Sequence, residues 1–144
     1  MWMDTKYEPG TVKVVAYDEN GKAVAETEMH TAGKPHHIEL VADRSQIKAD
    51  GKDLSFITVK VVDKDGNLCP LADNEIKFKV KGKGFYRAGA NGDPTSLESF
   101  QAPHMHVFNG MMTAIVSSTE EPGKITLEAT GKGLKKGTID IISE

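Results

Sequence analysis

The 144-residue chain lacks several features that mark large protein classes. It has one cysteine, Cys69, so no intramolecular disulfide can form. Cys69 stands beside Pro70, and no motif supplies a base that would activate its thiol, so the residue is predicted to be a small buried apolar group. No apolar run approaches the ~20 residues that cross a bilayer. The first residues show neither the basic start nor the apolar stretch of a signal peptide. No membrane partner is expected, and the compartment stays open, with a periplasmic or extracellular location as one option.

The chain also lacks an excess of positive charge. It holds 18 Lys and Arg against 21 Asp and Glu, a net charge of −3, and the two signs are interspersed. A nucleic-acid-binding surface needs clustered positive charge, so no nucleic-acid partner is expected. Aromatic residues make up 6% of the chain, which gives little support to a row of sugar-stacking rings. The length fits one domain, or one domain with a fragment of another.

What the sequence does contain is strand-like alternation. In residues 54–63 Ile57, Val59 and Val61 share one face, and Ile76, Phe78 and Val80 do so in residues 75–81. No segment has a sustained helical period. About seven short strands over roughly 110 residues predict an all-β, immunoglobulin-like β-sandwich. The Cys…Trp…Cys signature of antibody domains is absent. Further strands of this sandwich are predicted at 37–42, continuing after a bend at 47–49, and at 85–88, 111–117, 124–130 and 136–142.

The first thirty residues read as a β-hairpin. Residues 11–17 and 22–30 are strand-like and flank the turn Asp18-Glu19-Asn20-Gly21. A two-stranded hairpin is marginal alone. The hairpin must therefore add to a sheet, either in this chain or in a part that has been cut away. Without its parent sheet, the hairpin is expected to pack along the C-terminal sandwich or to pair with the same hairpin in a homodimer.

Candidate chemical groups are few. Residues 63–67 (Asp-Lys-Asp-Gly-Asn) have the oxygen-rich look of a calcium loop, but these residue types are those expected in a turn. His104 and His106 project to one side if they lie on a strand. They could then share a zinc ion, or they could be strand-edge histidines that bind no metal. Asp93 and Glu98 are the acids of one loop, but no spacing makes them a glycosidase pair. No catalytic residue, metal or cofactor is predicted.

The longest predicted loop, residues 89–110, separates two strands and is too long for a tight turn. Asn91-Gly92 and Asp93-Pro94 favour bends, and the Asp, Ser and Thr side chains can bond to nearby backbone amides. Phe100 and Phe108 are expected to pin the loop to the sandwich. Two interpretations follow: a self-packed Ω-type loop, or a functional surface that contacts a partner.

Three stretches belong together: residues 7–17 with 31–35, residues 49–59 with 62–67, and residues 91–100 with 108–110. They resemble the C-terminal region of bacterial family 2 glycoside hydrolases of the β-galactosidase type. The resemblance implies an accessory immunoglobulin-like module of an enzyme that hydrolyses terminal β-galactosides, with residues 1–33 ending a preceding immunoglobulin-like domain and residues 34–144 forming the C-terminal one. It further implies that the catalytic glutamates lie in a TIM barrel absent from this chain, and that the barrel and other domains are the module's partners.

The third stretch is the most specific, and the resemblance makes it a candidate interdomain or cleft contact. Leu97 stands where a histidine is common in this family, and residues 103–107 replace a more basic segment. The open alternative is a spacer of a bacterial surface adhesin or a carbohydrate-binding module with weak carbohydrate contact. The residues carried over are Asn91, Gly92, Asp93, Pro94, Thr95, Ser96, Glu98, Phe100, Phe108, Asn109 and Gly110.

Overall fold

The structure is a computed structural model that describes residues 6–144. These residues contain no helix, and so none that is long and apolar enough to cross a membrane. Their strands form a two-stranded, a five-stranded and a four-stranded sheet, in the orders β1-β2, β4-β11-β10-β6-β8 and β3-β5-β9-β7. The strands are β1 (Thr11–Tyr17), β2 (Ala23–His30), β3 (His37–Ala42), β4 (Gln46–Ile47), β5 (Leu54–Val62), β6 (Glu75–Gly82), β7 (Gly84–Ala90), β8 (His104–His106), β9 (Met111–Ser118), β10 (Gly123–Gly131) and β11 (Gly137–Ser143).

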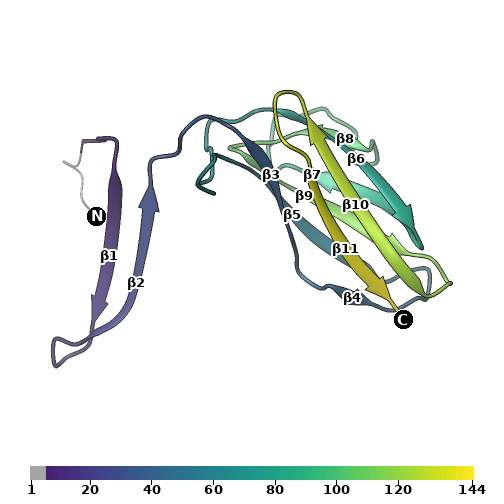
Figure 1. Cartoon of the computed structure of the whole chain (residues 1–144), viewed down its shortest axis with the longest axis horizontal. Helices are drawn as coiled ribbons and strands as arrows, with labels where there is room; N and C mark the ends of the chain where they lie inside the picture. The colour runs from purple at the N-terminus through teal and green to yellow at the C-terminus, as the bar shows by residue number, and fades with distance from the viewer. Residues whose placement is uncertain (1–5) are drawn as a thin grey trace.

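The four- and five-stranded sheets pack face to face, which confirms the predicted all-β sandwich (Figure 1). Ile57, Val59 and Val61 of β5 are fully buried, and from the opposite sheet Ile76 of β6 and Leu127 of β10 join them. Each fully buried aliphatic side chain of this size contributes about 1.5–3 kcal/mol relative to an exposed one. Cys69 lies in the same core, as predicted. The sandwich therefore has a hydrophobic core of its own.

Two short strands explain why the described sandwich has nine strands and not about seven. β8 lies inside the segment predicted as one long loop and pairs with β6 (Ile76 opposite Met105). β4 pairs with β11 in parallel over two residues. Strands of two or three residues leave too little alternation in a sequence to be recognised. The segment 47–49, predicted to continue the strand 37–42, is thus a separate strand in the other sheet, shorter and shifted to Gln46–Ile47.

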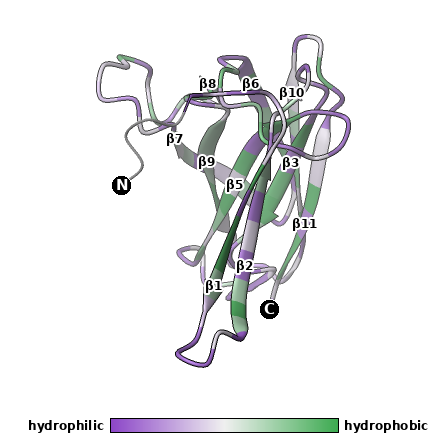
Figure 2. Ribbon diagram, turned by 90° about the vertical axis from the view of Figure 1, so that its left-hand side faces the viewer, coloured by the Kyte–Doolittle hydropathy of each residue, from purple (hydrophilic) through white to green (hydrophobic). Residues whose placement is uncertain are grey.

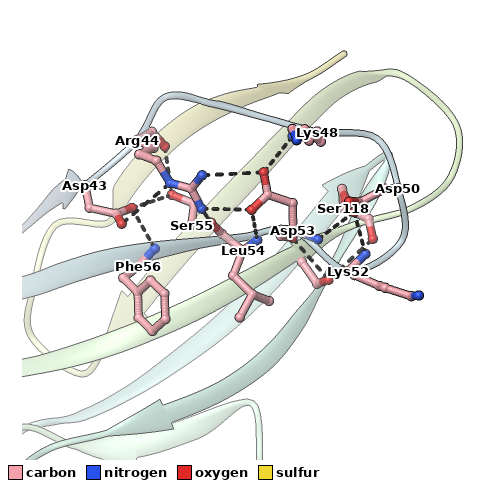
Figure 3. A network of polar contacts seen from close by, with 11 residues as sticks. Asp43, Arg44, Lys48, Asp50, Lys52, Asp53, Leu54, Ser55, Phe56 and Ser118 are labelled. Atoms are coloured by element: carbon pink, nitrogen blue, oxygen red, sulfur yellow. Dashed lines mark hydrogen bonds and ion pairs between the residues drawn. The ribbon is translucent and has the colours of Figure 1, made fainter.

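A polar network holds the chain where it crosses from β3 in one sheet to β4 in the other (Figure 3). The Arg44 guanidinium donates to Asp53 (2.9 Å) and to the Leu54 carbonyl. The Lys48 N–H, followed by Arg44, lowers the pKa of Asp53 to about 2. Asp43 accepts the N–H of Phe56 (2.8 Å). The corner therefore fixes the start of β5 in place.

The hairpin β1–β2 stands apart from the sandwich (Figure 1). Its turn is closed by Asp18, whose carboxylate accepts the N–H groups of Asn20 and Lys22 (both 2.9 Å). Residues 1–5 of the predicted unit 1–33 lie outside the described residues. One hairpin face carries the Lys13–Glu26 ion pair (2.9 Å). The other face is apolar and exposed, and the register places on it Val12, Val14, Ala16, Ala25 and Met29.

The linker between hairpin and sandwich is fastened by Asp63, a buried carboxylate at the end of β5. Asp63 accepts the N–H of Gly33 (2.7 Å) and also N–H groups of Asp65 and Asn67 (2.9 Å each). The Gly33 N–H lowers the pKa of Asp63 most; burial opposes this, and Asn67 and Asp65 add to the lowering, so the pKa lies far below its usual 3.8. The segment 63–67 is a turn that anchors the linker.

Replacing Asp63 with asparagine is expected to lower the melting temperature by several degrees at pH 7. The NH₂ group of asparagine is a donor, so it cannot accept the backbone N–H groups that the second carboxylate oxygen of Asp63 accepts. The pKa is lowered on folding, so the charged carboxylate stabilises fully above its usual value of 3.8. This contribution is lost as the pH falls through the folded-state pKa. The difference between wild type and D63N should therefore persist from pH 8 to 5 and shrink only in strong acid.

The matched control for this prediction is Asp65→Asn, two residues away, whose exposed carboxylate makes only a loose ion pair with Lys64 (3.8 Å). Melting curves of the wild type, D63N and D65N at a series of pH values provide the comparison. Equal melting temperatures for D63N and D65N at pH 7 would contradict the anchoring role of Asp63.

Candidate functional site

The loop 89–110 is fastened to the sandwich by its second half. β8 adds to the edge of the five-stranded sheet beside β6, and Met105 and Val107 are buried in the core. The Pro103 carbonyl accepts the N–H of Phe78 (2.8 Å), and the Val107 N–H donates to the Asn74 carbonyl (3.0 Å). These contacts do not involve the first half of the loop, residues 91–100, whose shape is set by its own side-chain hydrogen bonds.

Asn91 and Asp93 shape that first half through local hydrogen bonds. The Asp93 carboxylate accepts the N–H (2.8 Å) and the hydroxyl (2.7 Å) of Thr95. These two bonds, the N–H first, lower the pKa of Asp93. Asn91 accepts the N–H of Asp93 (3.0 Å) and donates through Nδ2 to the His106 carbonyl (3.0 Å). The side chains thus act as internal braces.

Glu98 ties the loop tip back to β8. His106 Nδ1 lies 2.8 Å from Glu98 Oε1, and the His106 N–H donates to the same carboxylate (3.2 Å). Burial raises the pKa of Glu98, but the bonds from His106 and Ser96 outweigh it, so that the pKa is lowered. Both acids of the loop are therefore engaged within it, and no general acid with a raised pKa, as glycoside hydrolysis requires, is present in the loop.

The loop ends in a tight turn of Asn109 and Gly110, both in the left-handed region at φ 53° and 76°. Phe108 and Met111 exchange backbone hydrogen bonds across it (2.9 and 3.1 Å). This is the two-residue Asn-Gly hairpin turn. A Cβ on Gly110 would lie 2.2 Å from the Cys69 carbonyl oxygen, so only glycine fits. The Asn109-Gly110 part of the loop motif is therefore needed for the fold.

The expectation that Phe100 and Phe108 pin the loop is wrong. Phe100 is 61% exposed and Phe108 40% exposed, and the anchoring side chains are Met105 and Val107. The physical reason is β8, which turns alternate residues inward and which the sequence reading did not assign as a strand. Leu97, the departure from the family pattern, is fully exposed.

The other candidate sites are structural in the described chain. His104 and His106 share a side of β8, but they approach different carboxylates, Glu75 (3.3 Å) and Glu98 (2.8 Å). Within residues 6–144 no group of three or more His, Cys, Asp or Glu side chains is placed to hold a metal ion. The oxygens of Asp63 in the calcium-like segment are used by N–H donors.

Comparison with known sequences and structures identifies this fold. Residues 38–140 match glycoside hydrolase family 2 C-terminal domain 5. The chain belongs to this family. Residues 1–25 match a different family, a domain of unknown function (DUF4982). The family 2 match spans nearly all of the sandwich, with the loop 89–110 inside it.

The chain spans 13–16% of the length of the first curated relatives that it matches. The chain is 49% identical over 139 residues to β-galactosidase BoGH2A of Bacteroides ovatus, covering 96% of this chain and 16% of that protein. A β-glycosidase structure from Bacteroides vulgatus aligns with a TM-score of 0.90 and 32% identity over 94% of this chain and 18% of that one. The D00-D0 domain of intimin shares the fold alone, at 17% identity and TM-score 0.57, over 95% of this chain and 66% of that one.

Proposed function

We propose that the chain is a non-catalytic C-terminal module of a longer family 2 glycoside hydrolase that acts on terminal β-galactosides. The observation that carries this proposal is the 49% identity, over nearly the whole chain, to a protein named a β-galactosidase in which the matching region is 16% of the length. The carboxylates of Asp93 and Glu98 are hydrogen-bonded within the loop, so neither is free to protonate a leaving group or attack a sugar. This favours a non-catalytic role for the loop.

Residues 1–33 and 34–144 are proposed to belong to two successive domains of that enzyme. The two family matches, to residues 1–25 and 38–140, support a division near the linker. The apolar, exposed face of the hairpin supports it too, because a strand pair with such a face is completed by further sheet or by a packed partner. In the chain by itself, a second copy of the hairpin is the alternative partner.

The loop 89–110 is proposed to contact a neighbouring domain through its exposed apolar residues. Asp93, Thr95 and Glu98 make the internal bonds of an Ω-type loop, so the motif acids serve the loop's shape. Leu97 and Phe100 are exposed and are free for such a contact. The loop would then support the architecture of the enzyme and perform no chemistry of its own.

The proposed function is tested by the upstream gene sequence, by an activity assay of the isolated chain and by a domain replacement. The coding region upstream of Met1 is expected to encode a glycosidase barrel, and the 144-residue chain alone is expected to hydrolyse neither p-nitrophenyl β-galactoside nor β-glucuronide. Inserted into BoGH2A in place of the matching 139 residues, the chain is expected to preserve β-galactosidase activity, because half of the residues are identical.

Three outcomes would overturn this function. Hydrolysis by the isolated chain would show that it is catalytic. Tandem copies of the module upstream of Met1, without a barrel, would favour the adhesin spacer, whose fold the intimin domain shares. A BoGH2A chimera that folds, as judged by its melting curve, but has lost activity would show that this module does not support that enzyme.

A further inference from the structure

The outer face of the five-stranded sheet is built for water. Lys81 Nζ lies 2.7 Å from Glu128 Oε1, and Lys124 Nζ lies 2.7 Å from Asp140 Oδ2, each pair across neighbouring strands. The Thr126 hydroxyl also donates to Asp140 (2.7 Å). Opposite charges paired across strands stabilise a solvated sheet face, so this side of the sandwich needs no partner.

The outer face of the four-stranded sheet has one cross-strand ion pair, Lys60 Nζ to Glu39 Oε1 (3.0 Å), and beside it an apolar area. The register places Phe56, Ile115 and Ala88 in one row across β5, β9 and β7, with Phe85 and Val41 on either side of that row. Phe56, Phe85 and Val41 are 43%, 41% and 46% exposed. We call these five residues the apolar sheet face. A contiguous exposed patch of this kind marks a contact surface more often than a surface left in water.

The loop 89–110 continues this surface. Phe100 and Gln101 line a surface hollow together with Phe85, Arg87 and Ala88 of β7, next to the apolar sheet face. The Gly89 N–H donates to the Phe100 carbonyl (2.7 Å), which holds the exposed ring beside β7. The exposed rings of the sheet and of the loop therefore form one surface.

The hairpin lies on the same side of the molecule as this surface. In Figure 1 the four-stranded sheet is the layer nearer the hairpin, and Figure 2 views the molecule from that side, with the hairpin in front of the sheet. The linker is fixed at the β3 edge, where the His36 N–H donates to Val62 (2.9 Å) and the Gly33 N–H to Asp63 (2.7 Å). The hairpin therefore leaves the sandwich from an edge of the sheet that carries the apolar sheet face.

We propose that the apolar sheet face, extended by Phe100, is the docking surface for the domain that precedes it in the same polypeptide, the domain to which β1 and β2 belong. The proposal rests on the proposed function for the existence of that domain. The polar side chains Arg87 and Gln101 lie at the hollow, whereas Phe56, Ile115 and Val41 extend the surface beyond it and offer no hydrogen-bonding group. A sugar site is a pocket with several placed polar groups, so an apolar surface wider than the hollow favours a protein partner.

Hydroxyl-radical footprinting tests this directly, because it reports the accessibility of individual side chains without any substitution. Phe56, Phe85 and Phe100 are expected to be labelled severalfold less in the longer polypeptide than in the 144-residue chain. Ile142, which is 42% exposed on the outer face of the other sheet, is the matched control and should be labelled equally in both. Equal labelling of the three phenylalanines in both proteins would overturn the proposal.

Substitution gives a second measurement in the longer polypeptide. Phe56→Ser with Phe85→Ser should raise the labelling of Phe100 to its level in the 144-residue chain, whereas Ile142→Ser should not. Protection of Phe85 and Phe100 in the 144-residue chain by a galacto-oligosaccharide would overturn the proposal in favour of a carbohydrate surface. Protection that rises with protein concentration in that chain would overturn it in favour of a second copy.

The docking surface and the proposed function can fail separately. Protected phenylalanines in a polypeptide that has no glycosidase barrel would leave the docking surface standing and refute the glycosidase role. A barrel upstream of Met1 together with fully labelled phenylalanines would support the glycosidase role and refute the docking surface.

Discussion

Gly110→Ala is expected to lower the free energy of unfolding by about 3 kcal/mol or more. The added Cβ would meet the Cys69 carbonyl oxygen at 2.2 Å and its carbon at 3.1 Å. Gly110 cannot move away easily, because its N–H donates to Ala72 (3.0 Å) and its carbonyl accepts from Val61 (2.9 Å). The substitution therefore forces the turn, the Cys69 segment or β5 to shift. Urea unfolding of the 144-residue chain measures the loss.

Gly92→Ala is the matched control for this prediction. Gly92 has nearly the same backbone angle, φ 77° against 76°, but a Cβ there would meet nothing within 4 Å. Only the cost of a left-handed non-glycine residue remains, about 1–2 kcal/mol. The difference between the two variants isolates the steric clash at Gly110. Equal losses would show that the close approach to Cys69 relaxes freely.

The long alternating strands could be predicted from the sequence because each carries its own burial pattern. Ile57, Val59 and Val61 alternate with polar residues in β5, and all three are buried as the pattern indicates. Ile125 and Leu127 in β10 behave in the same way. Here the local pattern and the tertiary environment agree, so a period of two residues is enough to assign both the strand and its inner face.

The structure of the candidate loop could not be predicted in the same way, because its contacts are distant in sequence. β8 has three residues, and its place beside β6 depends on pairing Ile76 with Met105. No local pattern records such a pairing. The bond between Asp93 and the Thr95 N–H, by contrast, is local, and the prediction that the Asp side chain bonds a nearby backbone amide holds for Asp93.

The apolar sheet face illustrates a further limit of sequence reading. Phe56 and Phe85 are separated by almost thirty residues, and only the register of β5, β9 and β7 brings them to one face. In the sequence Phe56 is one aromatic residue in a strand and Phe85 adjoins Tyr86, and a core would explain both equally well. The contrast with the ion-paired face of the other sheet is visible only when both sheets are assembled.

Met105→Ala is expected to cost about 2–5 kcal/mol of the free energy of unfolding. Met105 is fully buried at the centre of β8, and its partner in the register, Ile76, is fully buried too. Truncation removes three side-chain heavy atoms from the core and leaves a cavity that the surrounding strands can only partly close. Because β8 is the edge strand of its sheet, we also expect amide hydrogens of residues 104–107 to exchange faster.

Phe100→Ala distinguishes this account of the loop from the one that its aromatic residues suggest. With 61% of its surface exposed, Phe100 should change the stability of the 144-residue chain by about 0.5 kcal/mol or less. If Phe100 pinned the loop, F100A would destabilise the chain more than M105A. The expected order, with M105A far more damaging, means that the core side of β8 holds the loop while the exposed ring of Phe100 is free to contact a neighbouring domain.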